Sequence, residues 1–232
     1  MNQWAGINVI VFYSATVLEV NVGLSRNTAI VVGGCLNLAF AVGSLVPALG
    51  ADRFGRKKPL MFGAIGMGLS MMVVAILLSY SGTDKRKATA NASIAFFITY
   101  MLSFGGSLNA IPWCYSTEIL PLRIRAQGTA LVVFNNWIWV FVIVQITPTL
   151  VYNITWKTYL VFMAFNFAFV PMIYLWFPET KGLGLEEIDY IFLKSDRLPA
   201  ERREHVGRQI VGAESYGKPH STEIETQEKI NV

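Results

Sequence analysis

The chain has 232 residues, of which 53% are hydrophobic and only 15% are charged, and its formal net charge at pH 7 is +4. Soluble globular domains carry about 25% charged residues, so this composition excludes a soluble domain and indicates a membrane protein. The basic residues form no surface interleaved with aromatic residues, which argues against a nucleic-acid partner.

Six apolar stretches follow one another along the chain, separated by short polar breaks. A helix needs about 20 apolar residues to cross a bilayer, so we interpret each stretch as a membrane-spanning helix. The predicted spans are Gln3–Val20, Thr28–Gly50, Pro59–Tyr80, Ala92–Ser116, Gln127–Val151 and Trp156–Phe177. The sequence therefore predicts an all-α membrane protein, with a six-helix bundle over residues 1–194 and both ends of the bundle on one side.

The first predicted span is short. Its apolar part runs from Trp4 to Leu18, which is about 22 Å at 1.5 Å per residue against a hydrocarbon core of about 30 Å. The polar residues Asn2 and Gln3 come directly before it, without a charged signal-peptide region. On sequence alone we expect the chain to begin inside a transmembrane helix, as an incomplete chain or a truncated gene model would.

A short basic loop, residues 52–58, lies between the second and third spans. Its charged residues are Asp52, Arg53, Arg56, Lys57 and Lys58, with a net charge of +3. Such a loop between apolar spans is typical of the cytoplasmic side of a membrane. Gly55 permits a tight turn there, because glycine adopts backbone angles that a Cβ atom forbids. An ordinary cytoplasmic loop without further function stays open as an alternative.

From Ser195 onward the chain is polar and nearly free of aromatic residues. Such a segment cannot bury enough apolar surface to offset the entropy of ordering it. We therefore expect residues 195–232 to form a mostly disordered cytoplasmic tail.

Five short motifs stand in a fixed order along the chain. They are Asn2–Asn8 followed by Phe12-Tyr13, the loop Asp52–Lys57, Ile111–Trp113, Glu118–Arg125 and Pro178–Gly182. In order and spacing they resemble the signature motifs of the sugar porter family of the major facilitator superfamily, and of its fungal members in particular. The resemblance covers about Asn2 to Phe192 and corresponds to helices 7–12, the C-terminal half of a twelve-helix porter.

The resemblance assigns sugar binding to amide and tryptophan side chains inside the spans. A neutral sugar presents hydroxyl groups, which amides bind by both donating and accepting hydrogen bonds without burying a charge. The implied binding residues are Asn2, Gln3, Asn8, Trp113, Asn136 and Trp137. Amides at this depth are functional candidates, although hydrogen bonding between neighbouring helices is an alternative role for each of them.

The remaining intramembrane amides and tryptophans are assigned to other roles. We expect Gln145, Asn109, Asn135 and Asn166 to serve packing, and Trp4, Trp139, Trp156 and Trp176 to lie at the lipid interface or in the core. Asn37 stays open between a sugar role and packing, because Phe40 occupies the position where the family's eighth helix carries an asparagine.

Two residues are predicted to break the helices that carry the site. Pro112 lacks an N–H group and clashes with the carbonyl of Leu108, and Gly6 loosens the first helix. In a transporter a bent half-helix can move over the binding site. A static kink is the alternative.

The charged residues of the motifs resemble the family's cytoplasmic charge network. The implied members are Asp52, Arg53, Gly55, Arg56, Glu118, Arg125 and Glu179, with Gly55 forming the turn. Opposite charges of this kind pair when the inward mouth is closed and separate when it opens. A solvated surface of salt bridges, worth little energy, is the alternative.

These features together indicate one half of a transporter that moves a hexose or related sugar by alternating access, in the plasma membrane. Its expected partners are the sugar, the lipid bilayer and a six-helix N-terminal half from the same chain or a partner. No charged residue lies well inside a span, so proton symport and facilitated diffusion both stay open, as do polyols, disaccharides and quinate-like acids as substrates.

Three other kinds of molecule are considered. A sugar sensor of transporter-like fold, and a non-functional or half-size fragment that needs a partner, both stay open. An enzyme is disfavoured, because the sequence shows no nucleophile–base pair and no metal-binding cluster. Cys35 and Cys114 fall in apolar spans and His205 and His220 lie apart in the tail, so no catalytic residue, metal or cofactor is expected.

Overall fold

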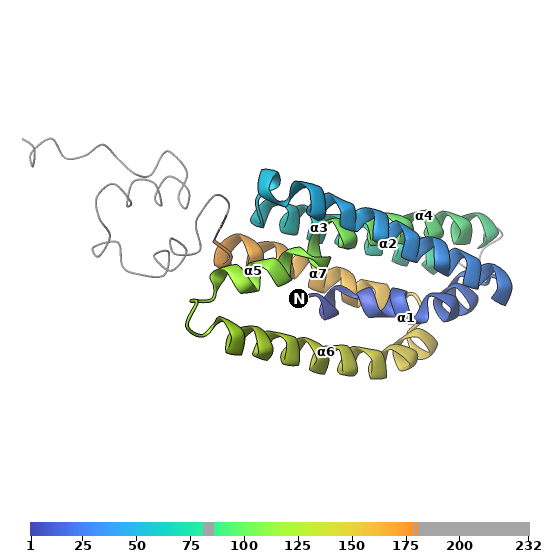
Figure 1. The fold of residues 1–232 in the computed structure, drawn as a ribbon. Coiled ribbons are helices and arrows are strands. Elements are labelled where there is room, and N and C mark those ends of the chain that lie inside the picture. Colours follow the sequence, from blue (N-terminus) through green and yellow to red (C-terminus); the bar gives the residue numbers. More distant parts are fainter. Residues whose placement is uncertain (81–85, 179, 181–232) are drawn as a thin grey trace, which may run out of the picture. The chain divides into compact units, whose positions relative to one another are not determined.

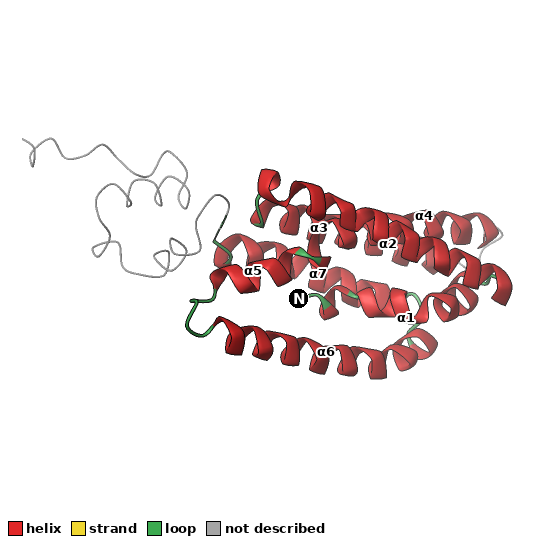
Figure 2. Cartoon of the chain, in the orientation of Figure 1, coloured by secondary structure: helices red, strands yellow, loops and turns green. Residues whose placement is uncertain are grey.

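The computed structural model describes residues 1–80, 86–178 and 180, and for residues 20, 21, 51–54, 86, 87 and 90 it describes the backbone alone. The predicted tail lies outside the described residues. In chain order the elements are η1 (Gln3–Ala5), α1 (Ile7–Val17), η2 (Leu18–Val22), α2 (Arg26–Phe54), α3 (Lys57–Ser79), α4 (Arg86–Phe104), η4 (Gly105–Asn109), α5 (Ile111–Ile119), α6 (Arg125–Asn153) and α7 (Lys157–Trp176) (Figure 1). Every element that Figure 2 draws is a helix, which confirms the predicted all-α class.

Five of the helical stretches are long and apolar enough to cross a membrane. They are Arg26–Gly50, Lys57–Ser79, Asn91–Ile119, Arg125–Asn153 and Lys157–Trp176, and they match the predicted second to sixth spans to within a few residues at each end. The first predicted span is divided, because α1 has 11 residues between the 3₁₀ turn η1 and the π-helical segment η2. A helix of that length is too short for a full crossing, so the described bundle has five full spans and one shorter apolar helix.

Three helices form the centre of the bundle. Helix α3 packs against both α4 and α7, and α4 with η4 also packs against α2. Fully buried side chains from these helices fill the space between them, among them Met67, Tyr100, Met101 and Phe162. The core therefore combines residues that are far apart in the sequence.

Small residues let two of these helices approach closely. A Cβ atom at Gly43 of α2 would lie 2.6 Å from the carbonyl oxygen of Leu102, and one at Gly105 of η4 would lie 2.5 Å from that of Phe40. In a bilayer, where apolar side chains gain little by leaving the lipid, such close backbone contact is a principal source of helix association.

Helix α6 lies along α1 and η1, at the other side of the bundle from α2 (Figure 1). It exposes large apolar side chains, including Leu131, Phe134 and Phe141, and α2 does the same with Leu38 and Leu49. Apolar surface of this kind is more stable against lipid or further helices than against water. The exposed faces thus agree with the membrane character that the composition predicts.

Candidate functional site

The chain turns sharply at Gly6, between η1 and α1. Its φ is 95° and its ψ is 11°, which is the left-handed region that favours glycine. A Cβ atom at this position would lie 2.8 Å from Cγ of Phe162 on α7, so the backbone runs directly against the aromatic ring. Gln3 precedes this bend in the chain and Asn8 follows it.

Three amide side chains form a hydrogen-bonded chain across this bend. Asn8 Nδ2 donates to Gln3 Oε1, and Gln3 Nε2 donates to Oδ1 of Asn136 on α6 over 2.8 Å. Tyr13 Oη donates to the carbonyl oxygen of Val144 over 3.1 Å, which links α1 to α6 a second time. The structure thus brings together three of the predicted binding residues, each with donor and acceptor capacity to spare.

A cavity of about 400 Å³ lies beside the amide chain. Asn2, Gln3, Trp113 and Asn136, all predicted site residues, line it. Its volume falls within the range of small-molecule pockets. Oδ1 of Asn2 is buried and has no hydrogen-bond partner in the described part of the chain. A buried acceptor without a partner is costly, and a bound hydroxyl group would satisfy it.

Trp137, predicted to form an aromatic wall of the sugar site, does not line this cavity. Its side chain is 64% exposed, whereas Asn135 and Trp139 of the same helix line the cavity. Helical residues three or four positions apart share a face, so Asn136 and Trp139 point the same way and Trp137 is turned aside. Trp139 also packs edge-on against Trp4, with ring centroids 5.3 Å apart. Helical spacing from Asn136 was the signal that could have identified Trp139.

Two other amides occupy positions away from this cavity. Asn37 Nδ2 donates to the carbonyl of Gly33, one turn earlier in α2, over 3.0 Å. Asn109 Nδ2 donates to Ser44 Oγ over 3.0 Å and so joins η4 to α2. Both bonds are of the kind expected of packing residues.

The second predicted break lies just ahead of Pro112. The π-helical segment η4 and Ala110 separate α4 from α5, and Pro112 stands in the first turn of α5, where a missing N–H group costs nothing. Trp113 follows immediately and directs its indole toward the cavity. The interruption therefore sets the direction of α5 and with it the position of this tryptophan.

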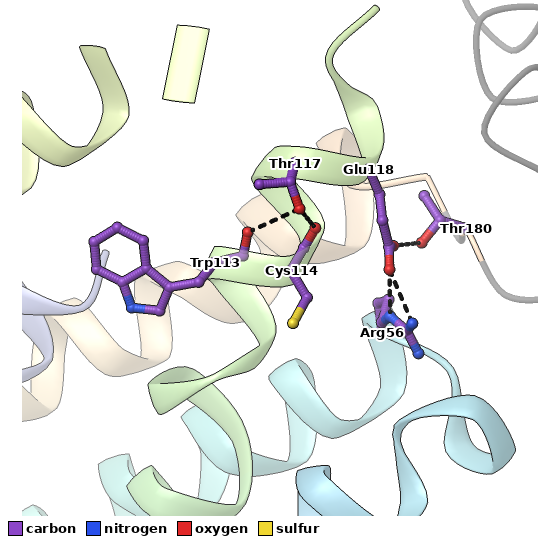
Figure 3. A network of polar contacts seen from close by, with 6 residues as sticks. All are labelled: Arg56, Trp113, Cys114, Thr117, Glu118 and Thr180. Carbon is purple, nitrogen blue, oxygen red and sulfur yellow. Dashed lines mark hydrogen bonds and ion pairs between the residues drawn. The ribbon is translucent and has the colours of Figure 1, made fainter. Parts of the chain in front are cut away.

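An ion pair joins Arg56 to Glu118 at one end of the bundle (Figure 3). Arg56 Nη2 lies 2.9 Å and Nε 3.2 Å from Glu118 Oε1, and Thr180 Oγ1 donates to Glu118 Oε2 over 2.8 Å. The two charged side chains are 14% and 19% exposed. Gly55, with a φ of 78°, turns the chain just before Arg56. The interaction thus connects three segments: the α2–α3 turn, α5 and the residues after α7.

The other predicted members of the network are placed differently. Arg125 donates through Nε to the carbonyl oxygen of Leu120 over 3.2 Å, which closes the turn between α5 and α6. The side chains of Asp52 and Arg53, and all of Glu179, lie outside the described residues. Sequence reasoning passed over Thr180, although it stands in the same motif as Glu179.

The chain resembles a known protein family and several curated proteins. The model of the family described as "Sugar (and other) transporter" matches residues 1–192. The MFS-type transporter oryC of Aspergillus oryzae is 37% identical over 199 residues, covering 85% of this chain and 37% of that protein. Sugar transporter STL1 of Saccharomyces cerevisiae is 30% identical over 193 residues, covering 83% of this chain and 33% of that protein. The chain spans about a third of the length of these relatives.

Among solved structures, the fold matches a crystal structure of a double tryptophan mutant of XylE with a TM-score of 0.73. The match covers 82% of this chain and 40% of the other, at 22% sequence identity. At that identity the likeness shows the fold alone.

Proposed function

The chain belongs to the sugar transporter family of the major facilitator superfamily, and from this premise we propose that its bundle forms one half of a pathway for a hexose or related sugar. The amide chain from Asn8 through Gln3 to Asn136, at the edge of a cavity of about 400 Å³, is the observation that carries the proposal. It offers several hydrogen-bonding groups to one ligand without a formal charge.

The chemistry of the lining favours a neutral ligand. None of the described side chains that line the cavity is charged, whereas a buried anion needs a cationic partner. Sugar hydroxyl groups both donate and accept, so they match the amides and the partnerless Oδ1 of Asn2. The indoles of Trp113 and Trp139 supply flat apolar faces for the C–H surface of a sugar ring. These features support a sugar over a quinate-like acid.

Movement of the sugar requires a second wall and two conformations. We place the second wall in another six-helix bundle, from the same polypeptide or from a partner, and the midplane site between the two. The Arg56–Glu118 pair closes the mouth in the described conformation and separates when the mouth opens. The basic loop favours an orientation with this pair on the cytoplasmic side, and the plasma membrane is the location that we propose.

A binding titration tests the site. The purified chain in lipid nanodiscs is titrated with D-glucose, D-xylose and quinate, and the tryptophan fluorescence of the cavity reports saturation. We expect saturable sugar binding that Asn136→Ala weakens about fivefold to tenfold, because each lost hydrogen bond contributes about 1 kcal/mol. Gln145→Ala, an exposed amide on the same helix outside the cavity, is the matched control and should leave the affinity unchanged.

Two results would contradict the proposal. One is the absence of saturable binding to either sugar, and the other is equal affinity of wild-type chain and Asn136→Ala. The pathway itself is tested in proteoliposomes that contain the chain together with the N-terminal half of STL1. Sugar uptake that requires both halves supports the proposal that this chain forms half of a pathway. Absence of uptake when both halves are present contradicts it.

A further inference from the structure

The backbone carbonyl of Ala5 receives two side-chain hydrogen bonds in the core of the bundle. Tyr100 Oη on α4 donates to it over 2.8 Å, and Asn166 Nδ2 on α7 donates to it over 3.0 Å. Ala5, Tyr100 and Asn166 are each 0% exposed. A carbonyl oxygen has two lone pairs, so these donors use its full capacity. We name this arrangement of three residues the Ala5 clamp.

The Ala5 clamp lies next to the bend at Gly6, between η1 and α1. Ala5 is the last residue of η1 and directly precedes Gly6, whose backbone runs against the ring of Phe162. Gln3 stands two residues before the clamped carbonyl and Asn8 stands three residues after it, and these amides hydrogen-bond to each other. Rotation of η1 relative to α1 would therefore displace one amide from the other.

The amide of Asn166 is only half satisfied. Its Nδ2 also donates to the carbonyl of Phe162 over 2.8 Å, but its Oδ1 is buried without a partner in the described part of the chain. A buried acceptor without a partner destabilises a fold, and an apolar side chain of similar size would avoid that cost. Packing alone does not account for an asparagine here, whereas the need for a donor to Ala5 does.

We propose that Tyr100 and Asn166 are positioning residues for the sugar site, because their bonds to the Ala5 carbonyl hold the Gly6 bend and so the relative placement of Gln3 and Asn8. The inference rests on the proposed sugar function and extends it to two residues that line no part of the cavity. A bend that is held in advance spares the ligand the cost of ordering it, which improves both affinity and selectivity.

The variants Tyr100→Phe, Asn166→Leu and their combination test the clamp in the full chain in nanodiscs. Each single change should weaken D-glucose affinity about twofold to tenfold, the effect of one hydrogen bond. The double variant should weaken D-glucose affinity by a factor larger than the product of the two single factors, because only in that variant does the Ala5 carbonyl lack both donors. Tyr159→Phe removes a hydroxyl from an equally buried tyrosine that packs on Phe97, and should leave affinity unchanged.

Melting temperature separates positioning from general stability. Asn166→Leu removes the partnerless oxygen, so its melting temperature should stay unchanged or rise while its sugar affinity falls. A merely structural role would lower both together. Parallel losses of melting temperature and affinity in all variants, Tyr159→Phe included, would overturn the inference.

Hydrogen–deuterium exchange of residues 3–10 gives a readout that needs no sugar. The double variant should exchange faster there than the wild-type chain, with α3 as an unchanged internal reference. If the wild-type chain binds no sugar, the proposed function fails while the exchange still decides whether the clamp holds the bend. Unchanged exchange in the double variant would overturn the inference whatever the sugar result.

Discussion

Replacing Glu118 by glutamine removes the carboxylate that accepts both bonds from Arg56 and the bond from Thr180. An exposed ion pair contributes about 0.2–1 kcal/mol, whereas breaking a fully buried pair costs about 3–5 kcal/mol. Here the two charged side chains are 14% and 19% exposed, so the pair is intermediate between an exposed and a fully buried pair, and nearer the buried one. We therefore expect a coupling free energy of about 2 kcal/mol between Arg56 and Glu118.

A coupling of that size is large enough to control a gate. If the pair forms in only one of two conformations, losing about 2 kcal/mol changes their population ratio about thirtyfold. The intrinsic sugar affinity should change much less, because neither Arg56 nor Glu118 lines the cavity. A pure loss of affinity without a change in conformational balance would contradict the gate.

A double-mutant cycle measures the coupling. The free energy of unfolding is determined in mixed micelles for Arg56→Gln, Glu118→Gln and the double variant, at low and at high salt. Thr180→Val serves as a reference for the loss of one hydrogen bond with no loss of charge, about 1 kcal/mol. A partly buried pair keeps most of its coupling at high salt, while a surface pair is screened. Coupling below about 0.5 kcal/mol would refute the reasoning and leave a solvated salt bridge.

Two further predictions use matched pairs of residues. Trp139→Leu should weaken sugar binding about tenfold in the fluorescence titration, since its indole lines the cavity, whereas Trp137→Leu should change it less than twofold; equal effects would restore Trp137 to the site. Gly6→Ala should lower the free energy of unfolding by about 2–5 kcal/mol in a denaturation series, through its φ of 95° and the contact with Phe162. Gly34→Ala, with open space at the added Cβ, should be neutral or stabilise by up to about 1 kcal/mol, and equal losses at both glycines would argue against a constrained bend.

Much of the fold follows from hydropathy, because a bilayer selects long apolar helices with little regard to tertiary detail. The predicted second to sixth spans are confirmed to within a few residues on this basis. The π-helical segments were not predictable in the same way. In η4, Gly105 sits against the carbonyl of Phe40, and that local geometry depends on how closely α2 approaches. No pattern in the 105–109 segment alone reports the position of α2.

The candidate site also combines residues that the sequence indicates with residues whose positions depend on tertiary packing. Gln3, Asn8 and Asn136 could be proposed as one group from the sequence, because polar groups inside a membrane are rare and the motifs contain or flank them, and the structure joins them by hydrogen bonds. Trp139 could have been found from its helical spacing to Asn136. The exposed position of Trp137 depends on the rotation of α6 about its axis, and α6 exposes apolar residues over much of its surface, which leaves no clear hydrophobic stripe to read. Asn166 was assigned to packing, since its acceptor is a backbone carbonyl 161 residues away in sequence.

Helix α5 connects the cavity to the ion pair. It has nine residues, carries Trp113 at the cavity and Glu118 five residues later, about 7.5 Å along the axis. In the described conformation it is fastened to the residues after α7, through the bond from Tyr115 Oη to the carbonyl of Pro178 over 3.1 Å and through that from Thr180 to Glu118.

Because η4 and Ala110 interrupt the helix ahead of α5, we expect this segment to move as a unit against these fastenings. A movement of the whole of α5 that shifts the indole of Trp113 then also changes the distance between Glu118 and Arg56. Linkage makes this coupling reciprocal, so a sugar that favours one position of α5 alters the ion pair by the same free energy with which the pair alters sugar binding. Saturating sugar should accordingly change the Arg56–Glu118 coupling free energy measured in the double-mutant cycle if α5 moves, whereas a rigid α5 would leave that coupling unchanged.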